Sequence, residues 1–304
     1  MVRIGIIGIG FMGYTHFEGA RKLKGGRVTA LATRSARKRR GDWTGIQGNF
    51  GPRGGKVDLS QVKTYADYHD LLADPDIDLV DICLPTDQHE QVTLEAIAAG
   101  KATLVEKPIA IAADHGGAVI DAIELKAADR MVRAAQKAGV PLMVGQVLPF
   151  FPEFHFAREC IESGKYGSLL AAHFHRVITP PKWSKDMSDY RKLGGWGVDL
   201  HIHDNHFIAL TCGLPQKVFS RGLVDDGLVN HVHSQYVYED ADKTVSCVSG
   251  GIAAEGLQFS HGFEIYLEKA TLLYNGATMG NEWVLDRPLT LITSDGKVRE
   301  PKLK

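Results

Sequence analysis

Short apolar runs alternate with stretches of helical periodicity in the first half of the chain. The helical stretches lie at 11–24, 88–99 and 129–138. The apolar runs, which we interpret as buried strands because they are short, non-alternating and bounded by turn residues, lie at 3–9, 28–33, 79–84, 102–105 and 141–144. Buried strands joined by helices predict a doubly wound parallel sheet of the Rossmann type, which places this half in the α/β class.

The pattern changes in the second half, where one helical stretch at 154–163 is followed by closely spaced strand patterns. These strand patterns lie at 169–177, 216–223, 232–238, 244–250, 262–267 and 270–274. Alternating polar and apolar residues at this spacing predict an open, mainly antiparallel sheet. We therefore expect two domains, 1–146 and 147–304, the second also of the α/β class.

The composition is that of a soluble globular protein, with 44% hydrophobic and 23% charged residues in a chain of 304. A formal net charge of −1 gives no general attraction to nucleic acid or to a membrane surface. The opening residues run directly into a strand, and no apolar run is long enough to span a bilayer. Four cysteines without short spacing suggest reduced thiols, so we expect a cytoplasmic protein.

A glycine motif, Gly8-x-Gly10-x-x-Gly13, lies between the first strand and the first helix. Gly8 permits a tight turn, Gly10 lets the backbone approach a pyrophosphate, and Gly13 lets the helix pack closely on the strand. The free N–H groups of the helix start would bind the phosphates. With Phe11 and Met12, these glycines predict a dinucleotide site.

Residues at the end of the second strand bear on the choice of cofactor. An NAD site usually has an acidic residue here to bind the ribose 2′-hydroxyl. This chain has Thr33, Arg34 and Ser35 instead. A neutral residue followed by Arg suits a 2′-phosphate, which favours NADP over NAD while leaving both open.

Two further motifs carry a family resemblance. Glu106-Lys107-Pro108 follows the strand at 102–105, and Leu84-Pro85-x-x-x-His89 follows the strand at 79–84. With the glycine motif, they make the chain resemble the glucose–fructose oxidoreductase / inositol dehydrogenase (Gfo/Idh/MocA) family from residue 1 to about 290. The resemblance implies NAD(P)-dependent oxidation or reduction of sugars, polyols or related small molecules. It adds to the cofactor site Leu84, Pro85, Thr86, His89, Glu106 and Lys107.

The resemblance also implies a catalytic set of Lys107 with Asp199 and His203, the last two matching the family's Asp-x-x-x-His pair. Histidine accepts a proton near neutral pH, and a lysine beside the hydroxyl stabilises developing alkoxide charge. Asp199 would orient the histidine or bind a neighbouring hydroxyl. The family's second domain, here 147–304, binds substrate and forms oligomers through its sheet, which implies a homodimer or homotetramer.

Several positions depart from the family pattern. His201 stands where a Gly or Ala is common, and His206 stands where an Asp is common. Residues 146–152 lack the family's Arg-Phe pair, and the sequence ends on strand-like residues where the family commonly has a helical segment. The particular sugar or polyol therefore stays open.

The histidine-rich stretch 199–206 raises the alternative of a metal site. Gly197 before it and Gly213 after it predict a helix. Helical spacing places Asp199, His203 and His206 on one stripe and separates His201 from them, so we expect no metal here. Aromatic residues and the remaining histidines make weaker substrate-site candidates, namely Trp183, Tyr190, Trp196, His201 and His206.

Three other functions compete with the oxidoreductase. A glycoside hydrolase of the same fold would hold NAD tightly and show no net turnover of it. A nucleotide-binding regulator would not need the Lys107, Asp199 and His203 set. A metal-dependent lyase or hydrolase would use the nine histidines that follow residue 150. Two insertions, 41–58 and 113–126, interrupt the first domain and have no assigned role.

Overall fold

A computed structural model describes residues 1–48, 53–110, 125–180, 195–239 and 243–303. The chain divides into two compact units, the first ending at Gly145 and the second running from Gln146 to Lys304. Each unit is described by itself. Trp183 and Tyr190 lie outside the described residues, as does most of the insertion at 113–126.

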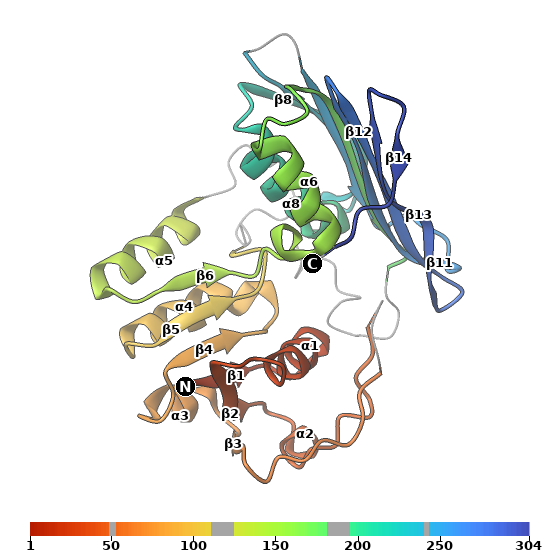
Figure 1. Cartoon of the computed structure of the whole chain (residues 1–304). Helices are drawn as coiled ribbons and strands as arrows, with labels where there is room; N and C mark the ends of the chain where they lie inside the picture. Colours follow the sequence, from red (N-terminus) through yellow and green to blue (C-terminus); the bar gives the residue numbers. More distant parts are fainter. Residues whose placement is uncertain (49–52, 111–124, 181–194, 240–242, 304) are drawn as a thin grey trace. The chain divides into compact units, whose positions relative to one another are not determined.

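The N-terminal unit contains a six-stranded sheet in the order β3-β2-β1-β4-β5-β6, with every neighbouring pair parallel (Figure 1). Its strands are β1 (Val2–Ile7), β2 (Gly26–Ala32), β3 (Lys63–Tyr65), β4 (Leu79–Ile82), β5 (Ala102–Val105) and β6 (Leu142–Val144). Its helices are α1 (Phe11–Ala20), α2 (Ala36–Arg39), α3 (Tyr68–Ala73), the short 3-10 helix η1 (Thr86–Gln88), α4 (His89–Ala98) and α5 (Leu125–Ala138). This order confirms the doubly wound sheet, whose direction of winding reverses between β1 and β4.

The insertion at 41–58 is fixed to the core of this unit through its described residues. Trp43 is fully buried, with its ring centroid 4.9 Å from that of Phe17 and 5.9 Å from that of Tyr14, both on α1. Its indole N–H donates to the carbonyl of Lys38 at 2.8 Å. An aromatic residue of this size contributes a large buried apolar area, which anchors the segment beside α1.

The C-terminal unit is built on an eight-stranded sheet in the order β14-β13-β12-β11-β7-β10-β9-β8. Neighbouring strands are antiparallel except for β7 and β10, which confirms the mainly antiparallel expectation. The strands are β7 (Leu169–Ile178), β8 (Lys217–Asp225), β9 (Leu228–Val237), β10 (Thr244–Gly250), β11 (Leu257–Leu267), β12 (Ala270–Met279), β13 (Glu282–Thr293) and β14 (Val298–Arg299).

Two helices, α6 (Pro152–Glu162) and α8 (Trp196–Cys212), cover one face of this sheet (Figure 1). Phe154 of α6 is the centre of the core between them, with ring centroids 5.1 Å from Phe207 of α8 and 5.1 Å from Phe263 of β11. Within the described ranges, no helix covers the opposite face. This asymmetry explains the alternating burial of β7 and β10, because only one face packs on helices.

Several elements differ from the sequence expectation: β3, α3, β13 and β14 were not expected, and β9 and β12 are longer than expected. β11 begins at Leu257 and not at Gly262, because His261 is an inward-facing core residue stacked on Phe154 with centroids 5.9 Å apart. The helix expected between Gly197 and Gly213 is confirmed as α8, which starts after Gly195 (φ 95°) and stops before Gly213 (φ 83°). Among the helices of the described residues, none has the length and apolarity to cross a membrane.

Candidate functional site

Two glycines of the N-terminal loop are required by close backbone contacts. Gly8 has φ +93°, and a Cβ there would lie 2.6 Å from the carbonyl oxygen of Cys83. A Cβ on Gly13 would lie 2.0 Å from the carbonyl oxygen of Gly8. Any side chain at these positions would force β1 away from β4 or α1 away from the loop, as expected for a dinucleotide-binding turn.

Gly10 differs from its neighbours because a Cβ built on it meets no atom within 4 Å. It is the N-cap of α1, with no side-chain hydrogen bond to the helix start and no acidic residue in the first turn. A free helix start beside an open glycine suits an anionic group, so these residues fit the pyrophosphate of a dinucleotide. The Phe11 ring lies against Gly48, whose Cβ would come within 2.0 Å of it, and Met12 is half-buried.

Basic side chains gather after β2, and most of them bind protein groups. Lys38 Nζ donates to the carbonyl of Ile9 in the glycine loop at 2.5 Å, and Arg39 donates to the carbonyl of Thr33 at 2.6 Å. Arg37 pairs with Asp42 at 2.7 Å, and Ser35 Oγ accepts from the backbone N–H of Lys38.

Arg34 differs from these cations. Its side chain is exposed and has no hydrogen bond or ion pair to the part of the chain that the structure describes. A cation without an internal partner is available to a ligand at the end of β2.

His89 joins the loops that follow β4 and β5. The ring is buried, with Nδ1 2.8 Å from the carbonyl oxygen of Pro108 and Nε2 2.9 Å from that of Leu84. Burial lowers the pKa of His89, with the two carbonyls acting in the opposite direction. The ring thus fixes the loop containing Pro85 and the buried Thr86 to the loop containing Lys107, which is a positioning role.

Lys107 is the second residue after β5 and is half-buried. Its backbone N–H donates to Oε2 of Glu106 at 3.2 Å. Because β1, β4 and β5 are parallel neighbours, their carboxyl ends meet at one edge of the sheet. The glycine loop, the loop after β4 and Lys107 therefore gather at the point where ligands bind in doubly wound folds.

In the C-terminal unit, α8 carries the other expected site residues. Asp199 is buried in the first turn, and its backbone N–H donates to the carbonyl of Gly195 at 3.0 Å. His203 and His206 are half-buried, and burial lowers the pKa of His206. The neutral form of an imidazole can accept a proton.

His201, whose role the sequence left open, lies on the face of α8 that packs against the sheet. Nδ1 is 3.0 Å from the hydroxyl oxygen of Ser249, and Nε2 is 2.9 Å from that of Ser234. Burial, with nearby His231 and His233, lowers the pKa of His201 to about 4. Both ring nitrogens are therefore held by protein hydroxyls, which gives His201 a role in packing the helix on β9 and β10.

Trp196, expected as a flat surface for a sugar ring, is 3% exposed and packs with Ile178 and Leu200. Its ring therefore lies in a satellite core of the C-terminal unit. A side chain buried to this extent offers little surface to a ligand.

Sequence patterns did not predict the buried ion pair between Arg176 of β7 and Asp204 of α8. Their separations are 2.8 Å from Nε to Oδ2 and 3.2 Å from Nη2 to Oδ1. The side chains are 4% and 0% exposed. Burial raises the pKa of Asp204, and Arg176 opposes that shift. A two-point contact of this kind fixes the rotation of α8 about its own axis. It therefore also fixes the direction of the helix face that carries Asp199 and His203.

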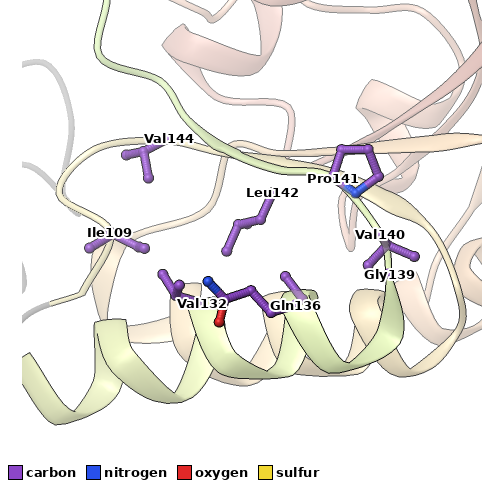
Figure 2. Close-up of a pocket in the computed structure, with 9 residues that line it drawn as sticks. Ile109, Val132, Gln136, Gly139, Val140, Pro141, Leu142 and Val144 are labelled. Carbon is purple, nitrogen blue, oxygen red and sulfur yellow. The ribbon is translucent and has the colours of Figure 1, made fainter.

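One hollow of the N-terminal unit lies between α5 and β6 and is shown in Figure 2. Its lining is apolar apart from Gln136, and it contains no titratable side chain. It therefore lacks the groups that proton transfer requires. The residues that line it are Ile109, Val132, Ala135, Gln136, Gly139, Val140, Pro141, Leu142 and Val144.

Comparison with known proteins finds a family model that matches the N-terminal unit. Residues 2–146 match the model described as the oxidoreductase family with an NAD-binding Rossmann fold. The myo-inositol 2-dehydrogenase of Thermotoga maritima is 28% identical over 229 residues, which are 74% of this chain and 60% of that protein. The 1,5-anhydro-D-fructose reductase of Ensifer adhaerens is 30% identical over 206 residues, or 67% of this chain and 54% of that protein.

The solved structure of a probable dehydrogenase from Thermotoga maritima has the same fold. Its TM-score is 0.74 at 23% identity, covering 99% of this chain and 81% of that one. At this identity the likeness concerns the fold alone. The chain matches 50% to 60% of the length of the first curated relatives.

Proposed function

Residues 2–146 belong to the Gfo/Idh/MocA oxidoreductases, and from that premise we propose that the protein transfers a hydride between a nicotinamide cofactor and a sugar, polyol or related small molecule. The observation that carries the proposal is the edge of the parallel sheet where β1, β4 and β5 end. A glycine loop with an open Gly10 and a half-buried Lys107 lie there together. Cofactor binding and substrate activation require these two features.

The proposed chemistry assigns one step to each residue. Lys107 holds the reacting hydroxyl and stabilises the negative charge that develops on its oxygen. His203 accepts the hydroxyl proton, since a neutral imidazole is a suitable base near pH 7. Asp199, one helical turn before His203, orients the imidazole or binds a neighbouring hydroxyl. The nicotinamide, when bound, supplies the hydride chemistry, and the protein positions it.

We favour NADP over NAD as the cofactor. No carboxylate stands at Thr33, Arg34 or Ser35, where an NAD site commonly has one. Arg34 is exposed at the end of β2 and is not engaged by the described residues, unlike Arg37, Lys38 and Arg39. A guanidinium with free donors suits a phosphate.

Replacement of Arg34 by Ala is expected to weaken NADP binding by about 10- to 100-fold, because a hydrogen bond between charged groups contributes about 1.5–3 kcal/mol. NAD binding should change by less than about twofold, since the lost charge has no phosphate to bind. Isothermal titration with both cofactors measures the two constants. Arg37→Ala is the matched control, because Asp42 already holds that guanidinium. Equal weakening of both cofactors by Arg34→Ala would contradict the NADP proposal.

A panel of sugars and polyols, assayed with NADP⁺ and NAD⁺, tests the activity directly. We expect net formation of reduced cofactor with at least one member. Cleavage of a glycoside by the purified protein, without net turnover of added cofactor, would replace this proposal with the glycoside hydrolase. Cofactor binding with no turnover of any panel member in either direction would favour a nucleotide-binding regulator.

We also propose that copies of the chain pair through the sheet of the C-terminal unit, as a homodimer or homotetramer. Support comes from the face of that sheet that no described helix covers (Figure 1). Exposed apolar side chains on two of its strands, among them Phe219 of the edge strand β8 and Trp283 of β13, are consistent with such pairing. Sedimentation measures the state directly.

A further inference from the structure

His16, in the middle of α1, lies between two carboxylates from different strands. Nδ1 is 2.9 Å from Oδ2 and 3.1 Å from Oδ1 of Asp81 on β4. Nε2 is 3.0 Å from Oε1 of Glu106, the residue after β5. Side-chain exposures are 16% for His16, 6% for Asp81 and 7% for Glu106. The proposed chemical steps do not use His16 or Asp81, although Glu106, an expected cofactor-site residue, directly precedes Lys107.

The geometry favours a shared proton over a metal ion. His16, Asp81 and Cys83 have ligand atoms close enough to surround a cation. However, a nitrogen and an oxygen bound to one tetrahedral zinc lie about 3.3 Å apart, given bonds of about 2.0–2.1 Å. The 2.9 Å separation of His16 and Asp81 instead matches a charge-assisted hydrogen bond.

Charges around the ring support a bound proton. Burial would lower the pKa of His16, but hydrogen bonding to Asp81, the Cys83 sulfur 3.4 Å away and the Glu106 carboxylate raise it well above its ordinary value. Burial and the Asp81 charge raise the pKa of the Cys83 thiol to about 12, so the thiol stays protonated. A protonated His16 ring thus places a positive charge between Asp81 and Glu106.

We propose that His16 is a positioning residue for Lys107, acting through Glu106. The chain of contacts runs from Nε2 of His16 to Oε1 of Glu106, and from Oε2 of Glu106 to the backbone N–H of Lys107 at 3.2 Å. It joins α1, whose start fits the cofactor phosphates, to the residue that holds the substrate hydroxyl. The catalytic role of Lys107 in this inference rests on the proposed function. The contacts among His16, Glu106 and Lys107 do not depend on it.

Two isosteric substitutions separate the two sides of the imidazole. The amide nitrogen of His16→Gln can replace Nε2 and still reach Glu106, whereas that of His16→Asn replaces Nδ1 and reaches only Asp81. We expect His16→Asn to lower kcat by about 10- to 100-fold with little change in the cofactor Kd, because small displacements of a positioned group have effects of this size. His16→Gln should recover most of that loss. Equal kcat in the two variants would overturn the proposal.

Two measurements test the contacts without enzyme activity. Acetylation of Lys107 by a soluble amine reagent, followed by peptide mass spectrometry, should be severalfold faster in His16→Asn than in wild type and near wild type in His16→Gln. The ¹⁵N shifts of His16 should show both ring nitrogens protonated at pH 8.5. A neutral ring at that pH, stoichiometric metal in the purified protein, or unchanged Lys107 acetylation would each overturn the inference.

A stability control excludes a general loss of folding. Leu72→Ala removes a buried side chain of α3 in the same unit and is expected to lower thermal stability while leaving Lys107 acetylation unchanged. If the acetylation results hold but Lys107→Ala leaves turnover intact, the proposed function fails and the contact network stands. If Lys107→Ala abolishes turnover but the His16 variants behave alike, only this inference fails.

Discussion

Replacing Lys107 by Ala is expected to lower kcat by about 100- to 1000-fold, the usual effect of removing one group that stabilises a developing oxyanion. His203→Asn is expected to lower kcat by about 100- to 10,000-fold, since it removes the proposed general base while keeping a polar side chain of similar size. The two residues lie in different units of the chain. If both variants lose turnover but still bind the cofactor, Lys107 and His203 act on the same reaction.

The controls are a lysine and a histidine that are outside the proposed chemistry. Lys137→Ala removes an exposed charge of α5 in the N-terminal unit, and His155→Asn changes an exposed ring of α6 in the C-terminal unit. Both should keep kcat within about twofold of wild type, as surface substitutions usually do. Stopped-flow measurement of a single turnover separates the chemical step from product release. Full turnover in either Lys107→Ala or His203→Asn would contradict its catalytic assignment.

Local signals in the sequence were sufficient for most of the N-terminal unit. The glycine motif fixes β1 and α1 within about ten residues, and its spacing requirement is visible in the contacts of Gly8 and Gly13. The helix α8 was also predictable from Gly197 and Gly213 and from the helical period of its histidines, although its start lies one residue before Gly197, after Gly195. Helical spacing alone separated His201 from Asp199 and His203.

Contacts between distant parts of the sequence could not be predicted in the same way. The partners of His201 are Ser234 and Ser249, which lie on two strands far along the chain. His16 and Glu106 meet only because β1, β4 and β5 are neighbours in the sheet. Residue spacing gives the face of a helix or strand but not the residue on the opposing element, so these networks needed the three-dimensional structure.

The predicted strand boundaries were wrong where functional or packing residues interrupt the alternation of polar and apolar positions. The inward-facing side of β11 includes His261, a polar residue buried in the aromatic core. Burial lowers the pKa of His261 well below its ordinary value. The pattern of β13 is interrupted by Asp286, Arg287 and Pro288, on its exposed portion. Tertiary packing overrides residue preference at such positions, which periodicity does not detect.

Asp204→Asn is expected to produce the largest loss of stability, about 3–5 kcal/mol, because it leaves the guanidinium of Arg176 buried without a counter-charge. The pair is almost completely buried, and among the described residues no other carboxylate forms a hydrogen bond or ion pair with Arg176. For a chain region of this size, a loss of that magnitude lowers Tm by roughly 10 °C. Urea and thermal unfolding measure the change.

An exposed ion pair in the same unit serves as the control for the effect of burying the Arg176–Asp204 pair. Arg158 and Glu162 on α6 lie 2.7 Å apart with side chains 34% and 48% exposed, so Glu162→Gln should cost less than about 1 kcal/mol. The double variant Arg176→Met/Asp204→Leu should recover much of the stability lost in Asp204→Asn, since it removes the buried charge together with its partner. That variant should still lose turnover, because α8 would no longer be held in the rotation that presents Asp199 and His203. Recovery of stability and of full turnover together would show that the ion pair does not orient α8.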